Sequence, residues 1–313
     1  MSCSTDQKIV LNGIDGSNPL AFLAALGTFL TSCHIFPSVR MSWIEHRGAW
    51  RPTLHGIASD EHEFADHLRG ALQLLSTSPF QIDKRMPFAA EKLSEAIAAA
   101  IPNAPSERRL ADFLAAFGSE IVLDGDNFVD TALRMVRSGD SAGQGFPQYA
   151  LMIREQTDCA SIHRSLFENW DYQDERRIDG TGKVFSLRWD PIEDSIYALR
   201  WTAPNKEIKN TMVGANSLAL ESLQLLPTIP NGSPITTTMF STHRKTLFFT
   251  WPIWSAPLST DVIRSLLSLS ELHVEHPNRD VLASRGIREA FRSRRYAPNQ
   301  YYRNFAPARS VGR

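Results

Sequence analysis

The segment from Gly16 to Val39 carries no charged side chain, and this run constrains the fold more than any other feature of the chain. Such a run is typical of a membrane span, a signal peptide or a helix buried in a protein core. A signal peptide needs a basic start, whereas Met1–Asp15 holds Lys8 against Asp6 and Asp15. A membrane span tolerates few of the small and polar residues found in the run, namely Gly27, Thr28, Thr31, Ser32, His34 and Pro37. We therefore expect a buried helix and no contact with a membrane.

The first 58 residues predict a strand, this helix and a hairpin. Ile9–Leu11 is a short apolar run typical of a strand. Ser17–Pro19 supplies a capping side chain and a proline suited to the first helical turn. Gly27 is small enough to let the helix approach a neighbour closely. The apolar runs Val39–Trp43 and Trp50–Leu54, separated by a turn, predict a hairpin.

Residues 59–170 predict a mainly helical region. Ser59 is the expected N-cap of a helix whose first turn is acidic, which suits the positive end of the helix dipole. Helical patterns follow near residues 90–100, 107–117, 127–137 and 160–168. Between the last two, the glycine-rich segment 138–147 is expected to be a loop, because Gln144–Pro147 is unsuited to opening a helix.

Residues 171–313 predict strands, two helices and a basic tail. Apolar and polar residues alternate over 185–189 and again over 197–201, which predicts a hairpin with one apolar face. Further strands are expected at 235–240 and 246–251, and helices at 215–226 and 260–269. The three parts, 1–58, 59–170 and 171–313, predict an α+β protein. It would have an N-terminal strand–helix–hairpin unit, a helical middle and a C-terminal antiparallel sheet with two helices.

The composition excludes several classes of protein. With 42% hydrophobic residues and a net charge of -1, the chain of 313 residues is neither disordered nor generally basic. Its three cysteines, Cys3, Cys33 and Cys159, are odd in number, widely spaced and without a C-x-x-C pair. Neither a disulfide framework nor a cysteine zinc site is expected, and a cytoplasmic location is the prediction.

Two segments resemble catalytic motifs without meeting their requirements. Gly139–Gly143 matches the G-x-S-x-G nucleophile turn around Ser141, but it follows a helical pattern where that turn needs a strand. Gly180–Lys183 resembles a phosphate loop but lacks the first glycine of the motif, since Arg177 stands there. A glycine loop and a hairpin turn are the expected structures.

Four segments resemble metal sites, and no metal or cofactor is expected at any of them. His62 and His67 are five residues apart and would point in different directions from a helix. His273 and His276 have no third ligand nearby in the sequence. The acidic segments 124–126 and 190–194 lack the further ligands that calcium requires and suit turns or helix caps.

The strongest functional signal is the charge of the C-terminal tail. Residues 284–313 hold eight arginines and one acid, Glu289, a local charge of +7, so the first 283 residues sum to -8. As a strand, the tail places Arg288, Arg292, Arg294 and Tyr296 on one face; as a helix, Arg288, Arg292 and Arg295. In either case Ile287 and Phe291 should face the core. Because arginine forks bind phosphates and tyrosines stack on bases, the tail predicts a nucleic-acid contact; the alternative is a charged edge strand that prevents aggregation. The candidate contacts are Arg285, Arg288, Arg292, Arg294, Arg295, Tyr296, Tyr301, Tyr302, Arg303 and Asn304.

Four segments together resemble a known family. They are Gly13–Gly27, Arg188–Trp201, Gly214–Thr228 and the arginine-rich end with Arg303-Asn304-Phe305. They resemble the large-subunit-type CRISPR-associated proteins of type I, subtype I-U, also called I-G. The resemblance covers both ends of the chain and leaves residues 59–170 uncovered.

The resemblance implies a non-catalytic subunit of an RNA-guided antiviral surveillance complex, Cascade. Its partners would be CRISPR guide RNA, target DNA, other Cascade subunits and a recruited helicase–nuclease. Such a subunit helps to recognise the short motif beside the DNA target, while base pairing reads the sequence itself. Two other functions stay open on the sequence alone: a guide-RNA-processing endonuclease, and a serine or metal hydrolase.

Overall fold

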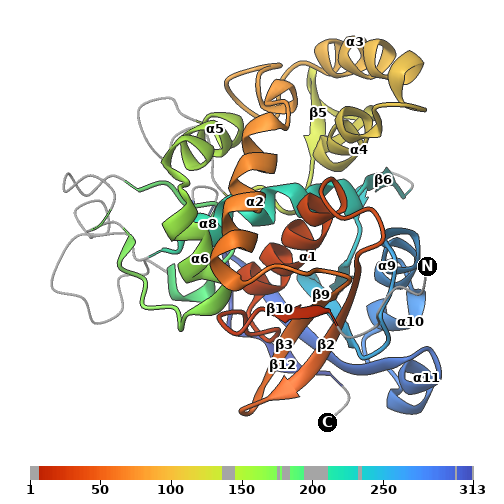
Figure 1. Ribbon diagram of the computed structural model, residues 1–313. Helices are drawn as coiled ribbons and strands as arrows, with labels where there is room; N and C mark the ends of the chain where they lie inside the picture. The colour runs from red at the N-terminus through yellow and green to blue at the C-terminus, as the bar shows by residue number, and fades with distance from the viewer. Residues whose placement is uncertain are drawn as a thin grey trace, which may run out of the picture.

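The computed structural model describes residues 7–135, 145–174, 177, 184–193, 211–231, 235–299 and 302–311 (Figure 1). Its helices are α1 (Pro19–Cys33), α2 (Glu61–Leu74), α3 (Ala90–Ala100), α4 (Arg108–Phe117), α5 (Phe146–Gln156), α6 (Cys159–Phe167), α8 (Val213–Glu221), α9 (Thr260–Leu267), α10 (Ser270–His273) and α11 (Arg279–Ser284). Its strands are β1 (Lys8–Val10), β2 (Arg40–His46), β3 (Ala49–His55), β4 (Gly118–Asp124), β5 (Asn127–Asp130), β6 (Thr228–Pro230), β7 (Ile235–Thr237), β8 (Phe240–His243), β9 (Thr246–Trp254), β10 (Ile287–Asn299), β11 (Tyr302–Phe305) and β12 (Arg309–Ser310). The predicted α+β class is confirmed.

Helix α1 is the buried helix that the uncharged run predicts. Asn18 caps it, because its side-chain oxygen accepts the backbone N–H of Ala21 at 3.2 Å. Its buried hydroxyl residues, Thr28, Thr31 and Ser32, each donate a hydrogen bond to the backbone carbonyl four residues earlier. The polar residues that argued against a membrane span are thus satisfied inside the helix itself.

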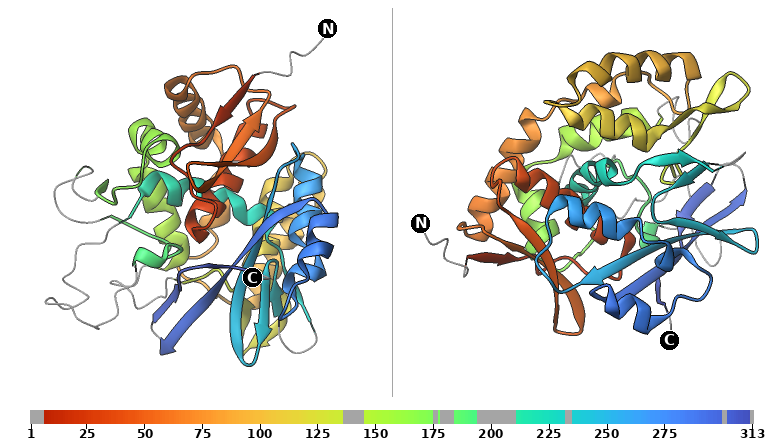
Figure 2. Two further views of the ribbon diagram at one scale, coloured as in Figure 1. Left: turned by 90° about the horizontal axis from the view of Figure 1, so that it is seen from below. Right: turned by 90° about the vertical axis from the view of Figure 1, so that its right-hand side faces the viewer.

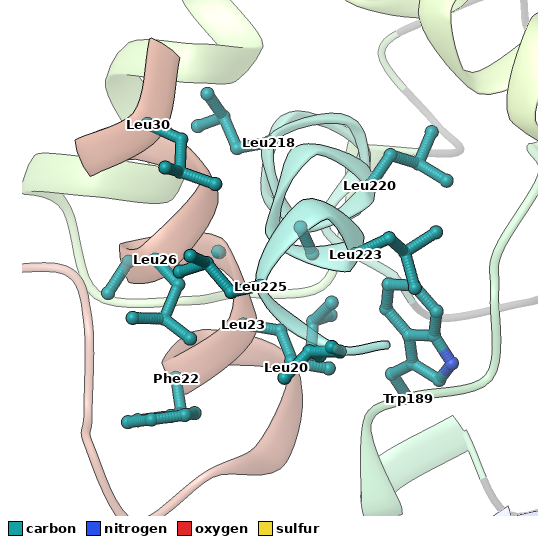
Figure 3. Close-up of a cluster of buried hydrophobic side chains, with 14 of the residues drawn as sticks. Leu20, Phe22, Leu23, Leu26, Leu30, Trp189, Leu218, Leu220, Leu223 and Leu225 are labelled. Atoms are coloured by element: carbon teal, nitrogen blue, oxygen red, sulfur yellow. The ribbon is translucent and has the colours of Figure 1, made fainter. Parts of the chain in front are cut away.

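Helices α1 and α8 cross at the centre of the molecule, and apolar side chains fill the space around them (Figure 3). The contact is as close as Gly27 predicts: a Cβ atom there would lie 1.7 Å from the carbonyl oxygen of Leu218. Gly214 on α8 is packed in the same way against α6, with a Cβ position 2.3 Å from the carbonyl oxygen of Ser161. Two glycines therefore allow three helices to touch through their backbones.

Two antiparallel sheets meet α1 through tryptophans. The N-terminal sheet has the order β1-β3-β2, so the predicted hairpin is confirmed. Phe22 of α1 stacks on Trp43 of β2, with ring centres 5.7 Å apart, and also contacts Trp251 of β9. The indole N–H of Trp251 donates to the carbonyl of Gly16, and that of Trp254 to the carbonyl of Met41. These bonds connect residues more than 200 positions apart in the sequence.

The helical middle differs from the prediction at three places. Asp60, not Ser59, caps α2, because the carboxylate of Asp60 accepts the N–H of Glu63 at 2.9 Å. Residues 127–130 form β5, which closes a hairpin with β4, instead of starting a helix. Helix α5 begins at Phe146, within the predicted loop, because Pro147 occupies the first turn, where its missing N–H costs nothing.

The predicted hairpin over 185–201 is only partly open to comparison, because its second arm lies outside the described residues. In its first arm, residues 184–190 form no strand. Arg188 has a backbone φ of 59°, which interrupts an extended chain between Leu187 and Trp189. Trp189 is nevertheless fully buried, and its indole N–H donates to the carbonyl of Leu133 at 2.7 Å.

The C-terminal antiparallel sheet is confirmed, in the order β11-β10-β9-β8 with β12 also paired to β10. The expected strand 235–240 is divided by a turn into β7 and β8, and Met239 in that turn has a φ of 70°. Helices α9, α10 and α11 lie along the sheet, where two helices were expected in the whole C-terminal part (Figure 2). In the part of the chain that the structure describes, no helix combines the length and the hydropathy needed to cross a membrane.

Candidate functional site

The basic tail folds as the long strand β10, so its arginines alternate between two faces of the sheet. Phe291 pairs with Trp251 and packs on it toward α1, with ring centres 6.0 Å apart, and Ile287 is buried. Arg292 pairs with Thr250 and Arg294 with Phe248, on the opposite face. The strand alternative for the tail is therefore confirmed and the helical one is wrong.

The outer face of this sheet gathers cations from three segments. Arg294 is exposed, and its guanidinium lies over the ring of Tyr296 at 5.1 Å. Arg309 of β12 is exposed beside Arg292, its cross-strand partner. Lys245 is exposed in the β8–β9 turn, directly before Thr246, the first residue of β9; further along β9, Phe248 pairs with Arg294. We call Lys245, Arg294, Tyr296 and Arg309 the basic sheet surface.

This surface carries little compensating negative charge. Within the described residues, neither Lys245, Arg294 nor Arg309 lies in an ion pair with an acid. Glu275 pairs with the exposed Arg244 of the β8–β9 turn at 2.9 Å. The surface can therefore offer cations and one aromatic ring to a polyanion.

Arg292 has a different role from its neighbour Arg294. It is half-buried, and its guanidinium donates to the backbone carbonyls of Leu272, Val274 and Glu275 at 2.7–3.0 Å. A further bond joins its Nε to the hydroxyl of Thr250 at 2.8 Å. Burial lowers the pKa of Arg292. The guanidinium thus holds the segment after α10 on the sheet, and it is not available to an external phosphate.

The other predicted contact residues are spread over several places. Arg285 is exposed and pairs with Glu271 at 3.2 Å, and Arg288 is exposed and donates to the hydroxyl of Ser255 at 3.0 Å. Arg295 lies on the inner face and donates to the carbonyl of Arg134 at 3.3 Å. Asn304 is buried and accepts the N–H of Phe305, whereas Arg303 is half-buried on β11.

The last two predicted contacts, Tyr301 and the side chain of Tyr302, lie outside the described residues. Lys245 and Arg309, by contrast, were missed by the sequence analysis. Arg309 belongs to the arginine-rich tail and could have been included on charge alone. Lys245 becomes part of the surface only through the register of β8, β9 and β10.

A second polar site joins three of the segments that carry the family resemblance. Asp190 is buried and accepts hydrogen bonds from the side chains of Asn18 at 3.0 Å and Tyr172 at 3.1 Å. Asn216 of α8 accepts the N–H of Leu187 at 2.9 Å. Segments 13–27 and 188–201 are therefore joined directly by the Asn18–Asp190 hydrogen bond, and segment 214–228 is bonded to Leu187, the residue before segment 188–201.

Glu193 completes this polar cluster. Its carboxylate accepts hydrogen bonds from the hydroxyls of Ser186 and Thr211. Burial and the nearby charge of Asp190 raise the pKa of Glu193 to about 7. Burial also raises the pKa of Asp190, and burial together with the Asp190 charge raises that of Tyr172. The cluster can hold a proton near neutral pH, and its bonds fix the positions of three segments.

The remaining sequence motifs have structural surroundings or lie outside the described residues. His62 stacks on His163 of α6 with ring centres 4.1 Å apart, whereas His67 packs against Phe36, so the two histidines do point apart as predicted. Gly125 and Asp126 form the β4–β5 turn, as expected, and Asp124 is the last residue of β4. Ser141 and Gly180–Lys183 lie outside the described residues. Within those that are described, no group of three His, Cys, Asp or Glu residues is arranged to hold a metal ion.

The basic sheet surface is therefore the candidate functional site, because it alone among these features combines exposure with unbalanced charge. Comparison of the chain with protein-family models, with curated proteins and with solved structures finds no match in any of the three.

Proposed function

We propose that this chain is a non-catalytic subunit of a type I CRISPR RNA-guided surveillance complex and binds nucleic acid through its basic sheet surface. In this role it contacts guide RNA and target DNA near the target-adjacent motif and helps to recruit a helicase–nuclease. The observation that carries the proposal is the exposed group of Lys245, Arg294 and Arg309, with Tyr296 against the guanidinium of Arg294. Arginine and lysine neutralise backbone phosphates, and an aromatic ring beside them suits an unpaired base.

The polar cluster supports the family part of the proposal. The resemblance rests on segments that are far apart in the sequence. Asn18 of the first donates a hydrogen bond to Asp190 of the second, and Asn216 of the third accepts one from Leu187, directly before the second. Residues that form one buried network are constrained together, which suits a resemblance carried by those same segments. The fourth segment contains β10 and β12, which carry Arg294, Tyr296 and Arg309 of the basic sheet surface.

Co-purification tests this function. The tagged full chain, expressed in its own host, is expected to bring down short RNAs that share one common segment and differ elsewhere, as guides do. Other subunits and a helicase–nuclease should be found in the same fraction by mass spectrometry. The matched variant Lys245→Ala/Arg294→Ala/Arg309→Ala should lose RNA. Recovery of no RNA, or of RNA without a common segment, would contradict the proposal. Guide-RNA cleavage by the purified chain would favour a processing endonuclease instead.

A further inference from the structure

A cavity of about 300 Å³ is lined by residues of α2, α5 and α8 and of the segment after α2, and it contains no residue of the basic sheet surface. Its polar lining consists of Arg69, Gln73, Thr77, Gln81, Arg154, Glu155 and Ser217. The volume is at the lower end of the range of small-molecule sites, about 300–1,000 Å³. None of these residues takes part in the function proposed above.

The cavity borders a buried ionic cluster with more positive than negative charge. Glu221 is fully buried and pairs with Arg154 and, through two bonds of 2.9 Å, with Arg109. One carboxylate therefore faces two guanidinium groups. Burial lowers the pKa of Arg154 to about 9, and the charges of Arg109 and Arg69 act in the same direction. A further anion at this place would relieve the repulsion between the arginines.

Two buried polar groups of the lining have hydrogen-bonding capacity that no described residue uses. Arg154 is 8% exposed, and its Nε has no partner within the described part of the chain, although its terminal nitrogens bind Glu221 and the carbonyl of Leu72. Ser217 is fully buried, and its hydroxyl also has no partner there. Because buried donors are nearly always satisfied, two orphans beside one cavity indicate a missing acceptor.

Arg69 adds a third donor at the opening. It is half-buried, and it has no acidic partner among the residues that the structure describes. Glu155 is the opposing charge in the lining and is exposed. The cavity and the adjoining ionic cluster together hold three cations and two anions. The cations are Arg69, Arg109 and Arg154, and the anions are Glu155 and Glu221.

We propose that this cavity binds a phosphate group, either as free phosphate or as the phosphate of a nucleotide, between Arg69, Arg154 and Ser217. Guanidinium groups bind phosphate through several charge-assisted hydrogen bonds, and a hydroxyl donates one more. Leu72, Leu75 and Leu151 in the same lining supply apolar surface against which the flat ring of a nucleotide base can pack. The site is independent of the proposed nucleic-acid surface.

Titration calorimetry and thermal unfolding with three probes test the proposal: sodium phosphate at constant ionic strength, adenosine 5′-monophosphate, and adenosine. We expect phosphate and the monophosphate to bind and to raise the melting temperature, and adenosine to do neither. Tighter binding of the monophosphate identifies a nucleotide site, and equal binding identifies a phosphate site. Absence of binding by both anions would overturn the proposal.

Variants separate this cavity from the rest of the surface. Arg69→Gln removes one charge-assisted contact and should weaken phosphate binding about tenfold. Glu155→Gln removes the opposing charge and should strengthen it. The control Lys245→Ala/Arg294→Ala/Arg309→Ala should bind phosphate as the wild type does. Circular dichroism checks that each variant is folded. Equal affinity in Arg69→Gln and wild type, or loss in the control, would contradict the assignment.

Discussion

Neighbouring arginines on one strand serve different purposes, and the alternation of the strand alone does not distinguish them. Arg292 and Arg294 share a face of β10, yet Arg292 is used by three backbone carbonyls while Arg294 is exposed over Tyr296. The difference comes from the segment after α10, which covers one residue and not the other. A substitution of both arginines together would therefore mix a structural effect with a binding effect.

Arg292→Ala should destabilise the protein by about 1–3 kcal/mol, because it leaves partly buried carbonyls without their donor. Hydrogen exchange over residues 270–276 should accelerate more than elsewhere. The matched control Arg294→Ala removes an exposed side chain and should change the free energy of unfolding by less than about 0.5 kcal/mol. Urea denaturation of both variants measures this. Equal stability of the two variants would show that the Arg292 contacts contribute nothing.

Glu193 should make the stability of the protein depend on pH. Its pKa rises from an ordinary value of 4.5 to about 7 in the folded protein, through burial and the charge of Asp190. The folded state therefore binds this proton more tightly than the unfolded state, and its contribution to stability is complete below pH 4.5. As the pH rises from there to about 7, that contribution is lost.

The variant Glu193→Gln cannot lose a proton at this position, so it isolates the effect. Urea midpoints at pH 5.5, 6.5 and 7.5 should fall more steeply for wild type than for the variant, because only the wild type loses the Glu193 proton over this range. The histidines titrate in both proteins, so the difference between the two midpoints removes their contribution. A constant difference across this range would mean that Glu193 titrates at an ordinary pKa.

At the scale of elements, the contact between α1 and α8 depends on the absence of a single methyl group. A Cβ at position 27 would lie 1.7 Å from a backbone oxygen, which cannot move aside as a side chain could. Gly27→Ala should therefore destabilise the protein by about 3 kcal/mol or more, at the upper end for overpacked cores. Thermal and urea unfolding measure the change.

Gly70 on α2 provides a matched control. A Cβ there meets no atom within 4 Å, and alanine favours a helix more than glycine does. Gly70→Ala should therefore stabilise the protein by about 0.5–1 kcal/mol. If both substitutions had the same effect, close backbone packing at Gly27 would not be what holds the two helices.

Local patterns predicted the elements whose residues decide their own structure. Helix α1 is evident from its uncharged run and from Asn18, and β2 and β3 from two apolar runs around a turn. The failures lie where contacts from elsewhere in the chain decide. Residues 127–130 form a strand because they pair with β4, and residues 185–189 alternate in polarity but are bent at Arg188.

The candidate site was only partly predictable for the same reason. The charge of the tail and its inward Phe291 are evident from the sequence, and both are found in β10. Burial of Arg292 and Asn304 depends on segments that cover them, and Lys245 joins the surface through strand register. Sequence spacing describes one strand and contains no information about its neighbours.

Over the whole molecule, charge is distributed unevenly along the chain. The net charge is -1, yet the last thirty residues carry +7, and the structure turns part of this charge outward on one sheet face. Helices α3 and α4 lie at the end of the molecule remote from β12 (Figure 1). A polyanion should therefore contact one end of the protein, with an affinity that depends on salt.

The most direct test of this account is the salt dependence of nucleic-acid binding. Dissociation constants for single-stranded RNA would be measured at three salt concentrations for wild type and for Lys245→Ala/Arg294→Ala/Arg309→Ala. The control Arg40→Ala/Lys92→Ala/Arg108→Ala removes three exposed cations from β2, α3 and α4. Each phosphate contact contributes about 0.7 to the slope of log K against log salt, so three lost contacts should flatten it by about two. The account predicts this flattening in the first variant and a wild-type slope in the control. An unchanged slope in the first variant, or the same loss in both, would contradict it.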